Sequence, residues 1–104
     1  MYIKLTFDEN IELGQMTETE VNFEIIKDWI YTPAYATKKS IKQSEFYNAA
    51  TIGMKPELVF VVRDFEYQNH ERLKYNNVTY EIIRAYEIDD VVELIVTTWS
   101  GSDV

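Results

Sequence analysis

The stretch LVFVVRDFEYQNHERLKYNNVTYEIIRAYEIDDVVELIVTTW, residues 58–99, decides the fold. It opens with a continuous β-branched and aromatic run, Leu58–Val62, which is typical of a strand buried on both faces. Asn76-Asn77 and Asp89-Asp90 interrupt the β-prone sequence that follows, and Asn tolerates the positive φ that a two-residue hairpin turn requires. Strands joined by turns this short must pair antiparallel. The predicted strands of this half are residues 58–62, 73–75, 78–86 and 91–99, with a polar loop over 66–71.

The first half of the chain predicts shorter extended segments. Apolar residues alternate with polar ones over 3–7 and again over 21–25, and this period of two predicts a strand in each place. The acidic stretch 8–20 lies between them and is predicted as a loop. Residues 29–37 are β-prone again, and Pro33, which lacks an N–H donor, places this strand at a sheet edge or kinks it.

One segment changes its period from two to 3.6. Four residues fall on one helical face at the spacing i, i+3, i+4 and i+7: Phe46, Ala49, Ala50 and Gly53. They predict a short helix over roughly 43–52, with Ser40 or Ser44 as its N-cap and Pro56 helping to end it.

Together these elements predict an α+β, mainly β, fold in one domain spanning residues 1–104. Five or six strands would form a small antiparallel sheet or a partly open β-barrel with one short helix, followed by a flexible tail over 100–104. The predicted core residues are Phe46, Ala49, Leu58, Phe60, Val62, Tyr80, Ile82, Leu94 and Val96.

Composition excludes several classes of function. The chain has 104 residues and a net charge of −8. It contains no Cys, so it can form neither disulfides nor thiolate metal sites. Only residues 32–56 are net basic, and a protein that grips a phosphate backbone needs clustered Lys and Arg. The first residues lack a signal-peptide pattern and no apolar run is long enough to span a membrane. We therefore expect synthesis in the cytoplasm and no membrane association.

Catalytic patterns are weak throughout. His70 is the only histidine and lies in a charged loop, where a solvated surface role is expected. The chain has no H-E-x-x-H zinc motif and no glycine-rich phosphate-binding loop. We therefore expect no enzyme activity, and no catalytic, metal or cofactor site. Lysines near aromatic residues, as in oligonucleotide-binding barrels, leave a small binding barrel as an alternative; these are Lys38, Lys39 and Lys42 beside Tyr35, Phe46 and Tyr47.

The order of these segments resembles a known family. The succession is Trp29, Ala34-Tyr35-Ala36, Ser44–Ala49, Phe60–Arg63, the hairpin Arg72–Ile82 and the closing strand Glu93–Val96. It is similar to the head-closure, or "stopper", proteins that join head and tail in tailed bacteriophages. In that family an Ala-bearing strand, a short Glu-x-x-x-Ala helix, a strand ending in Arg and a Tyr-x-Ile hairpin occur in this order. Asn76-Asn77 stands where the family usually has Gly in its hairpin turn.

The resemblance implies a structural virion protein of a phage or prophage. Such proteins form a homo-oligomeric ring beneath the portal and adaptor proteins, close the DNA channel and offer a docking surface to tail proteins, while DNA passes without specific binding. It also implies candidate channel or ring-contact loops on both sides of the central strands. Their residues are Ile52, Gly53, Met54, Lys55, Pro56 and Glu57 after the predicted helix, and Glu66, Tyr67, Gln68, Asn69, His70 and Glu71 in the polar loop.

Two alternatives to head closure remain at the level of sequence. A tail completion or tail-terminator protein would have a similar size and would also belong to a virion. A free-standing barrel of oligonucleotide-binding or SH3 type would instead present a ligand groove and stay monomeric.

Overall fold

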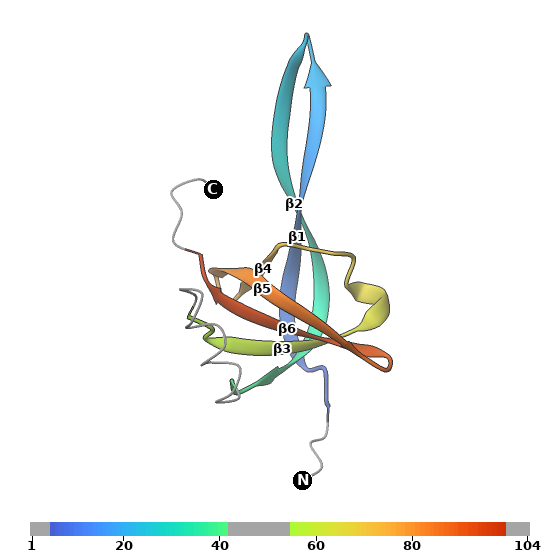
Figure 1. Ribbon diagram of the computed structural model, residues 1–104, viewed down its shortest axis with the longest axis vertical. Coiled ribbons are helices and arrows are strands. Elements are labelled where there is room, and N and C mark those ends of the chain that lie inside the picture. The colour runs from blue at the N-terminus through green and yellow to red at the C-terminus, as the bar shows by residue number, and fades with distance from the viewer. Residues whose placement is uncertain (1–4, 42–54, 100–104) are drawn as a thin grey trace.

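The computed structural model describes residues 5–41 and 55–99, which form a closed six-stranded β-barrel (Figure 1). Its strands are β1 (Glu9–Val21), β2 (Glu24–Lys39), β3 (Leu58–Arg63), β4 (Arg72–Tyr75), β5 (Val78–Ile88) and β6 (Val91–Thr98), with a 3-10 turn, η1 (Asp64–Glu66), after β3. Around the barrel the order is β1-β2-β3-β6-β5-β4, and every neighbouring pair is antiparallel. The prediction of a mainly β antiparallel fold is confirmed, but the barrel is closed rather than partly open.

Strand β1 accounts for that difference, because residues 8–20 were wrongly predicted as a loop. From Glu9 onward this stretch is strand, paired with β2 along its whole length and with β4 at three positions, Glu12–Lys74, Leu13–Leu73 and Gly14–Arg72. Ile11 and Leu13 point into the barrel and are buried, which gives β1 an inward face where it closes the barrel. The polar residues Thr17–Glu20 of this stretch lie beyond the barrel, where both faces of the strand meet water.

Three other predictions for the first half are also corrected. Residues 5–7 are not strand, and Phe7 has a positive φ of 52°. The apolar alternation over 21–25 runs through a turn at Asn22-Phe23 that joins β1 to β2, so it does not mark a separate strand. The edge strand predicted from Pro33 is not found, because β2 lies between β1 and β3 in the closed barrel. Pro33 pairs with Glu12 of β1 and precedes Ala36, where pairing with β3 begins, so its missing N–H costs no bond to β3. Tyr35, two residues after Pro33, donates its backbone N–H to the Glu66 carboxylate (3.2 Å) rather than to a neighbouring strand.

The barrel interior contains most of the predicted core. Phe60, Val62, Leu94 and Val96 are fully buried, and Leu58, Tyr80 and Ile82 are partly buried against them. Ile11, Leu13, Ala34, Ala36, Leu73 and Val92 complete this cluster. Phe46 and Ala49, with the predicted helix 43–52 and the tail 100–104, lie outside the described residues.

Strand β3 is buried on both faces, as the run Leu58–Val62 predicted. Phe60 and Val62 point into the barrel, whereas Val59 and Val61 form a second cluster on its outside with Ile95 of β6. The predicted turns are confirmed as well, because Asn76, Asn77 and Asp89 all have φ between 50° and 64°.

The β1–β2 hairpin extends well beyond the barrel, as Figure 1 shows. Residues 15–21 of β1 and 24–30 of β2 pair only with each other, from Gln15–Ile30 to Val21–Glu24. We call residues 15–31 the arm. At about 3.3 Å per strand residue it projects roughly 25 Å, which accounts for the elongated shape of 56 × 30 × 25 Å.

Candidate assembly surface

The arm carries the most concentrated group of exposed apolar side chains among the described residues. Six large hydrophobic residues on it are exposed: Met16, Val21, Phe23, Ile25, Ile26 and Ile30. Directly opposed residues lie on one face of a two-stranded sheet, so Met16 and Ile25 are on one face and Ile26 and Ile30 on the other. The arm therefore has no single face that could pack on the barrel and hide these side chains. This exposed apolar surface makes the arm the candidate interaction surface of the described residues.

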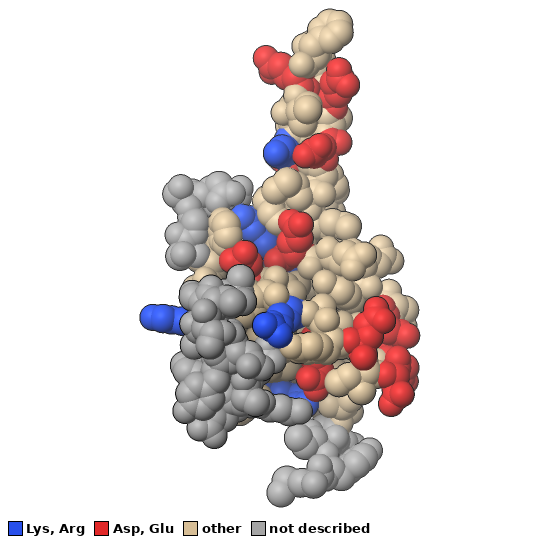
Figure 2. Space-filling model, in the orientation of Figure 1, with Lys and Arg blue, Asp and Glu red and all other residues tan. Residues whose placement is uncertain are grey.

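Acidic residues surround the apolar ones. The arm has four acids, Glu18, Glu20, Glu24 and Asp28, and one base, Lys27. Figure 2 shows acidic side chains on both sides of the arm just below a tip that carries no charge. The net charge of the arm is thus −3, so its surface combines apolar side chains with negative charge.

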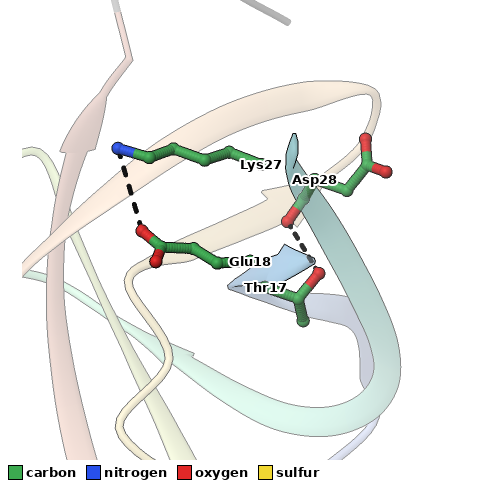
Figure 3. A network of polar contacts seen from close by, with 4 residues as sticks. All are labelled: Thr17, Glu18, Lys27 and Asp28. Carbon is green, nitrogen blue, oxygen red and sulfur yellow. Dashed lines mark hydrogen bonds and ion pairs between the residues drawn. The ribbon is translucent and has the colours of Figure 1, made fainter. Parts of the chain in front are cut away.

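Few contacts hold the two strands of the arm together beyond their backbone ladder. The Lys27 ammonium lies 3.8 Å from the Glu18 carboxylate, and the Thr17 hydroxyl donates to the carbonyl oxygen of Asp28 at 3.3 Å (Figure 3). Lys27 and Glu18 are both more than half exposed, and an ion pair in water contributes little stability. An isolated two-stranded hairpin is marginally stable in water, so the arm depends on its attachment to the barrel and on any partner that covers it.

The base of the arm is fixed by an arginine between two tryptophans. The guanidinium carbon of Arg72, on β4, lies 4.0 Å from the ring centre of Trp29 on β2 and 4.2 Å from that of Trp99 after β6. Arg72 is only 4% exposed, and a desolvated guanidinium stacked on an aromatic face is a strong form of this contact. An open hollow of about 370 Å³ adjoins these three side chains. The arrangement joins the arm to two other parts of the barrel wall.

A close approach of backbone and ring completes the base. Lys74 places its ammonium 3.9 Å from the centre of the Tyr31 ring. Opposite Tyr31, a Cβ on Gly14 would lie 2.6 Å from Tyr31 Cε1 and 3.2 Å from Arg72 Cβ. Glycine at this position therefore leaves the space in which the Tyr31 ring lies across β1, and a larger residue would force that ring to move.

The predicted loop Glu66–Glu71 lies at this base and is held by hydrogen bonds. The Gln15 side chain donates to the carbonyl of Gln68 (3.1 Å), and Glu71 N–H donates to the carbonyl of Gly14 (3.0 Å). Glu66 accepts from Tyr35 N–H on β2, as noted above. Asn69 adopts a positive φ of 57°. The structure thus places this loop as a brace between the arm and the barrel.

His70 is not the surface residue that its charged neighbours suggested. It is buried at 7% exposure, beside the ring of Tyr67, whose hydroxyl donates to the carbonyl of His70 (3.3 Å). The Nδ1 atom accepts a hydrogen bond from Gln68 N–H (3.1 Å). Burial lowers the pKa of His70 and raises that of Tyr67. Burial inside the loop therefore favours the neutral form of both groups.

The other predicted loop is described only from Lys55 onward, and Ile52, Gly53 and Met54 lie outside the described residues. Lys55 is exposed and Pro56 is buried. Glu57 accepts hydrogen bonds from Thr98 N–H and from the Thr97 hydroxyl, which lower the pKa of its carboxyl. Its own N–H donates to the carbonyl of Val96 (2.9 Å). Glu57 therefore ties the start of β3 to the end of β6.

Of the predicted loop residues, Glu57 is bonded to the end of β6 and Gln68 to the arm. The arm itself, which extends furthest from the barrel, was not predicted from the sequence. Alternation of Thr and Glu over 17–20, opposite a β-prone stretch, was the available signal. Among residues 5–41 and 55–99, no group of His, Asp or Glu side chains is placed to hold a metal ion, and no helix is long and apolar enough to cross a membrane. No family model and no curated protein matches the chain.

Proposed function

We propose that the protein is a structural subunit of the head–tail connector of a tailed phage or prophage. In this role it forms a ring that closes the DNA channel below the portal and adaptor proteins and offers a docking surface to the tail. The observation that carries the proposal is the arm, because its exposed apolar side chains belong to a protein that completes its surface in an assembly.

The division into barrel and arm suits such a ring. A closed barrel has no free sheet edge over most of its wall, so copies can stand side by side without merging their sheets. The arm, by contrast, reaches about 25 Å from the barrel and presents both outer edges of its two strands. Each copy thus has a rigid body and an extension that can reach a neighbouring component.

Charge supports the same role. The net charge of −8 per copy opposes adhesion to the DNA backbone, so DNA would pass a ring of such subunits without specific binding. The same charge disfavours self-assembly of the free protein, so ring formation would need the portal and adaptor as a template. Lys55, Pro56 and Glu57 remain candidates for the channel side, and the loop Glu66–Glu71 for contacts between copies.

Deletion of the gene in the phage that carries it tests the proposal. We expect DNA-filled or leaking heads to accumulate beside free, complete tails. Electron microscopy would count these particles, and nuclease sensitivity of the packaged DNA would show leakage. Expression of the intact gene from a plasmid should restore joined particles. Normal virions after deletion would contradict the proposal, and intact heads with defective tails would assign the protein to tail completion.

A further inference from the structure

The turn at the end of the arm has an unusual residue for its backbone conformation. Asn22 and Phe23 have φ of 52° and 66°, and they form the two-residue connection between β1 and β2. Such turns strongly favour Asn followed by Gly, because a Cβ atom is strained at positive φ; Gly has no Cβ, and Asn tolerates this region better than an aromatic residue does. Asn76-Asn77 makes the matching connection between β4 and β5, with φ of 50° and 64°, and uses a residue that tolerates this region.

Phe23 obtains no burial in return for this strain. Its side chain is 97% exposed, the highest value among the exposed large hydrophobic residues. Gly or Asn at this position would suit the turn better and would leave no aromatic ring in water. Backbone strain at a position where the side chain makes no intramolecular contact points to a function outside the folded chain.

We propose that Phe23 is the anchor by which the arm docks onto a different protein, entering an apolar pocket whose rim carries Lys or Arg. An aromatic side chain in a pocket, surrounded by polar contacts, is the usual centre of a protein interface. Val21 and Ile25 flank Phe23 and would line the mouth of the pocket. Glu20 and Glu24 flank it as well, and a basic rim would pair with them.

Charge argues against a second copy of this chain as the partner. Outside the arm, the described residues carry twelve acids and seven bases, a net charge of −5. An arm of net charge −3 is therefore repelled by the body of another copy, and a basic partner is favoured. The kind of assembly, a virion connector, rests on the proposed function, whereas the anchor role of Phe23 rests on its positive φ and its exposure.

Photo-crosslinking from the tip tests the anchor in the full chain. Phe23→p-benzoylphenylalanine and, as the matched control, Asn77→p-benzoylphenylalanine would be expressed with the neighbouring genes in phage-producing cells, and crosslinked peptides identified by mass spectrometry. We expect position 23, and not position 77, to crosslink to another virion protein at an apolar segment with Lys or Arg nearby. A crosslink to another copy of this chain, equal crosslinking from both positions, or none from position 23 would overturn the inference.

A second pair of variants separates docking from folding. Phe23→Gly should lower the amount of this protein retained in particles at least tenfold, while its urea unfolding midpoint is no lower than that of the wild type. Asn77→Gly should leave the retained amount unchanged, and its urea unfolding midpoint should also be no lower than that of the wild type. Full retention of Phe23→Gly would refute the anchor even if deletion of the gene blocks head–tail joining. A tip-specific crosslink to a basic apolar site on a protein that is not a virion component would support the anchor and refute the proposed function.

Discussion

Replacing Arg72 tests how the arm is attached to the barrel. Arg72→Met keeps the length and apolar stem of the side chain but removes the cation that lies 4.0 Å and 4.2 Å from the two indole ring centres. Each such contact contributes about 0.5–1 kcal/mol when exposed and about 2 kcal/mol or more when desolvated. Since Arg72 is 4% exposed, we expect a total loss of about 2–4 kcal/mol in the free energy of unfolding.

Tryptophan fluorescence makes this measurement direct. The chain has two Trp residues, Trp29 and Trp99, and both contact Arg72, so their emission during urea unfolding reports on the site itself. A domain of this size has a stability of about 5–15 kcal/mol, so the variant should still fold. Faster hydrogen exchange at the backbone amides of residues 29–31 should accompany the loss, because the base of the arm is loosened.

Two further variants show whether the planar cation matters. Arg72→Lys keeps the charge but cannot stack a flat guanidinium between two rings, so its loss should be intermediate. Lys38→Met removes an exposed cation 5.4 Å from the Tyr75 ring and should change stability by no more than about 0.5 kcal/mol. If Arg72→Met is as mild as Lys38→Met, the two tryptophans do not depend on Arg72 and our account of the base is wrong.

Three other predictions concern the barrel and its loops. Leu94→Ala should lower the free energy of unfolding by about 2–5 kcal/mol, because the side chain is fully buried. Ile88→Ala on the same hairpin, where the side chain is about half exposed, should lower it by under about 1 kcal/mol. Equal losses in urea unfolding would show that the inward face of β6 is misassigned. Gly14→Ala should cost about 1–3 kcal/mol by forcing Tyr31 to move, and an unchanged near-ultraviolet circular dichroism spectrum would argue against that movement. Burial lowers the pKa of His70 below its usual 6.5, so the unfolded chain binds the proton more readily than the folded chain, and the free energy of unfolding should fall as the pH drops below 6.5. His70→Asn keeps an acceptor for Gln68 N–H and should remove this part of the pH dependence. If the variant shows the same dependence of stability on pH as the wild type, His70 is not its cause.

The second half of the fold could be predicted because its signals are local. Apolar residues in β3 and β6 mark strands within a few positions, and Asn76-Asn77 and Asp89 supply the positive φ that their turns need. Each of these features depends on neighbours in sequence, which is the information that a periodicity carries. The core residues of β3 and β6 were predicted for the same reason.

Closure of the barrel could not be predicted in this way. It depends on three residue pairs between β1 and β4, such as Leu13 with Leu73, which lie sixty positions apart in the chain. Residues Glu9–Val21 show apolar alternation only at Ile11 and Leu13, since residues 15–21 of β1 lie beyond the barrel with water on both faces. The burial of His70 was missed for a related reason, because a polar loop becomes an interior only when the arm and β2 lie against it.

The apolar alternation of Val21, Phe23 and Ile25 occurs at an exposed turn, although the same pattern is typical of a half-buried strand. Their alternation is typical of a strand with one buried face, yet the structure places a turn in the middle of it and all three side chains in water. Folding alone gives no reason for apolar residues at these positions, and a turn residue such as Gly would make the hairpin more stable. The barrel does not need the tip, because its core is complete without it. A sequence that keeps Phe at positive φ on the end of an arm of roughly 25 Å is therefore best explained by selection for what the arm contacts. The gain in free energy of unfolding on Phe23→Gly would measure the stability that the folded chain gives up to keep Phe at the tip.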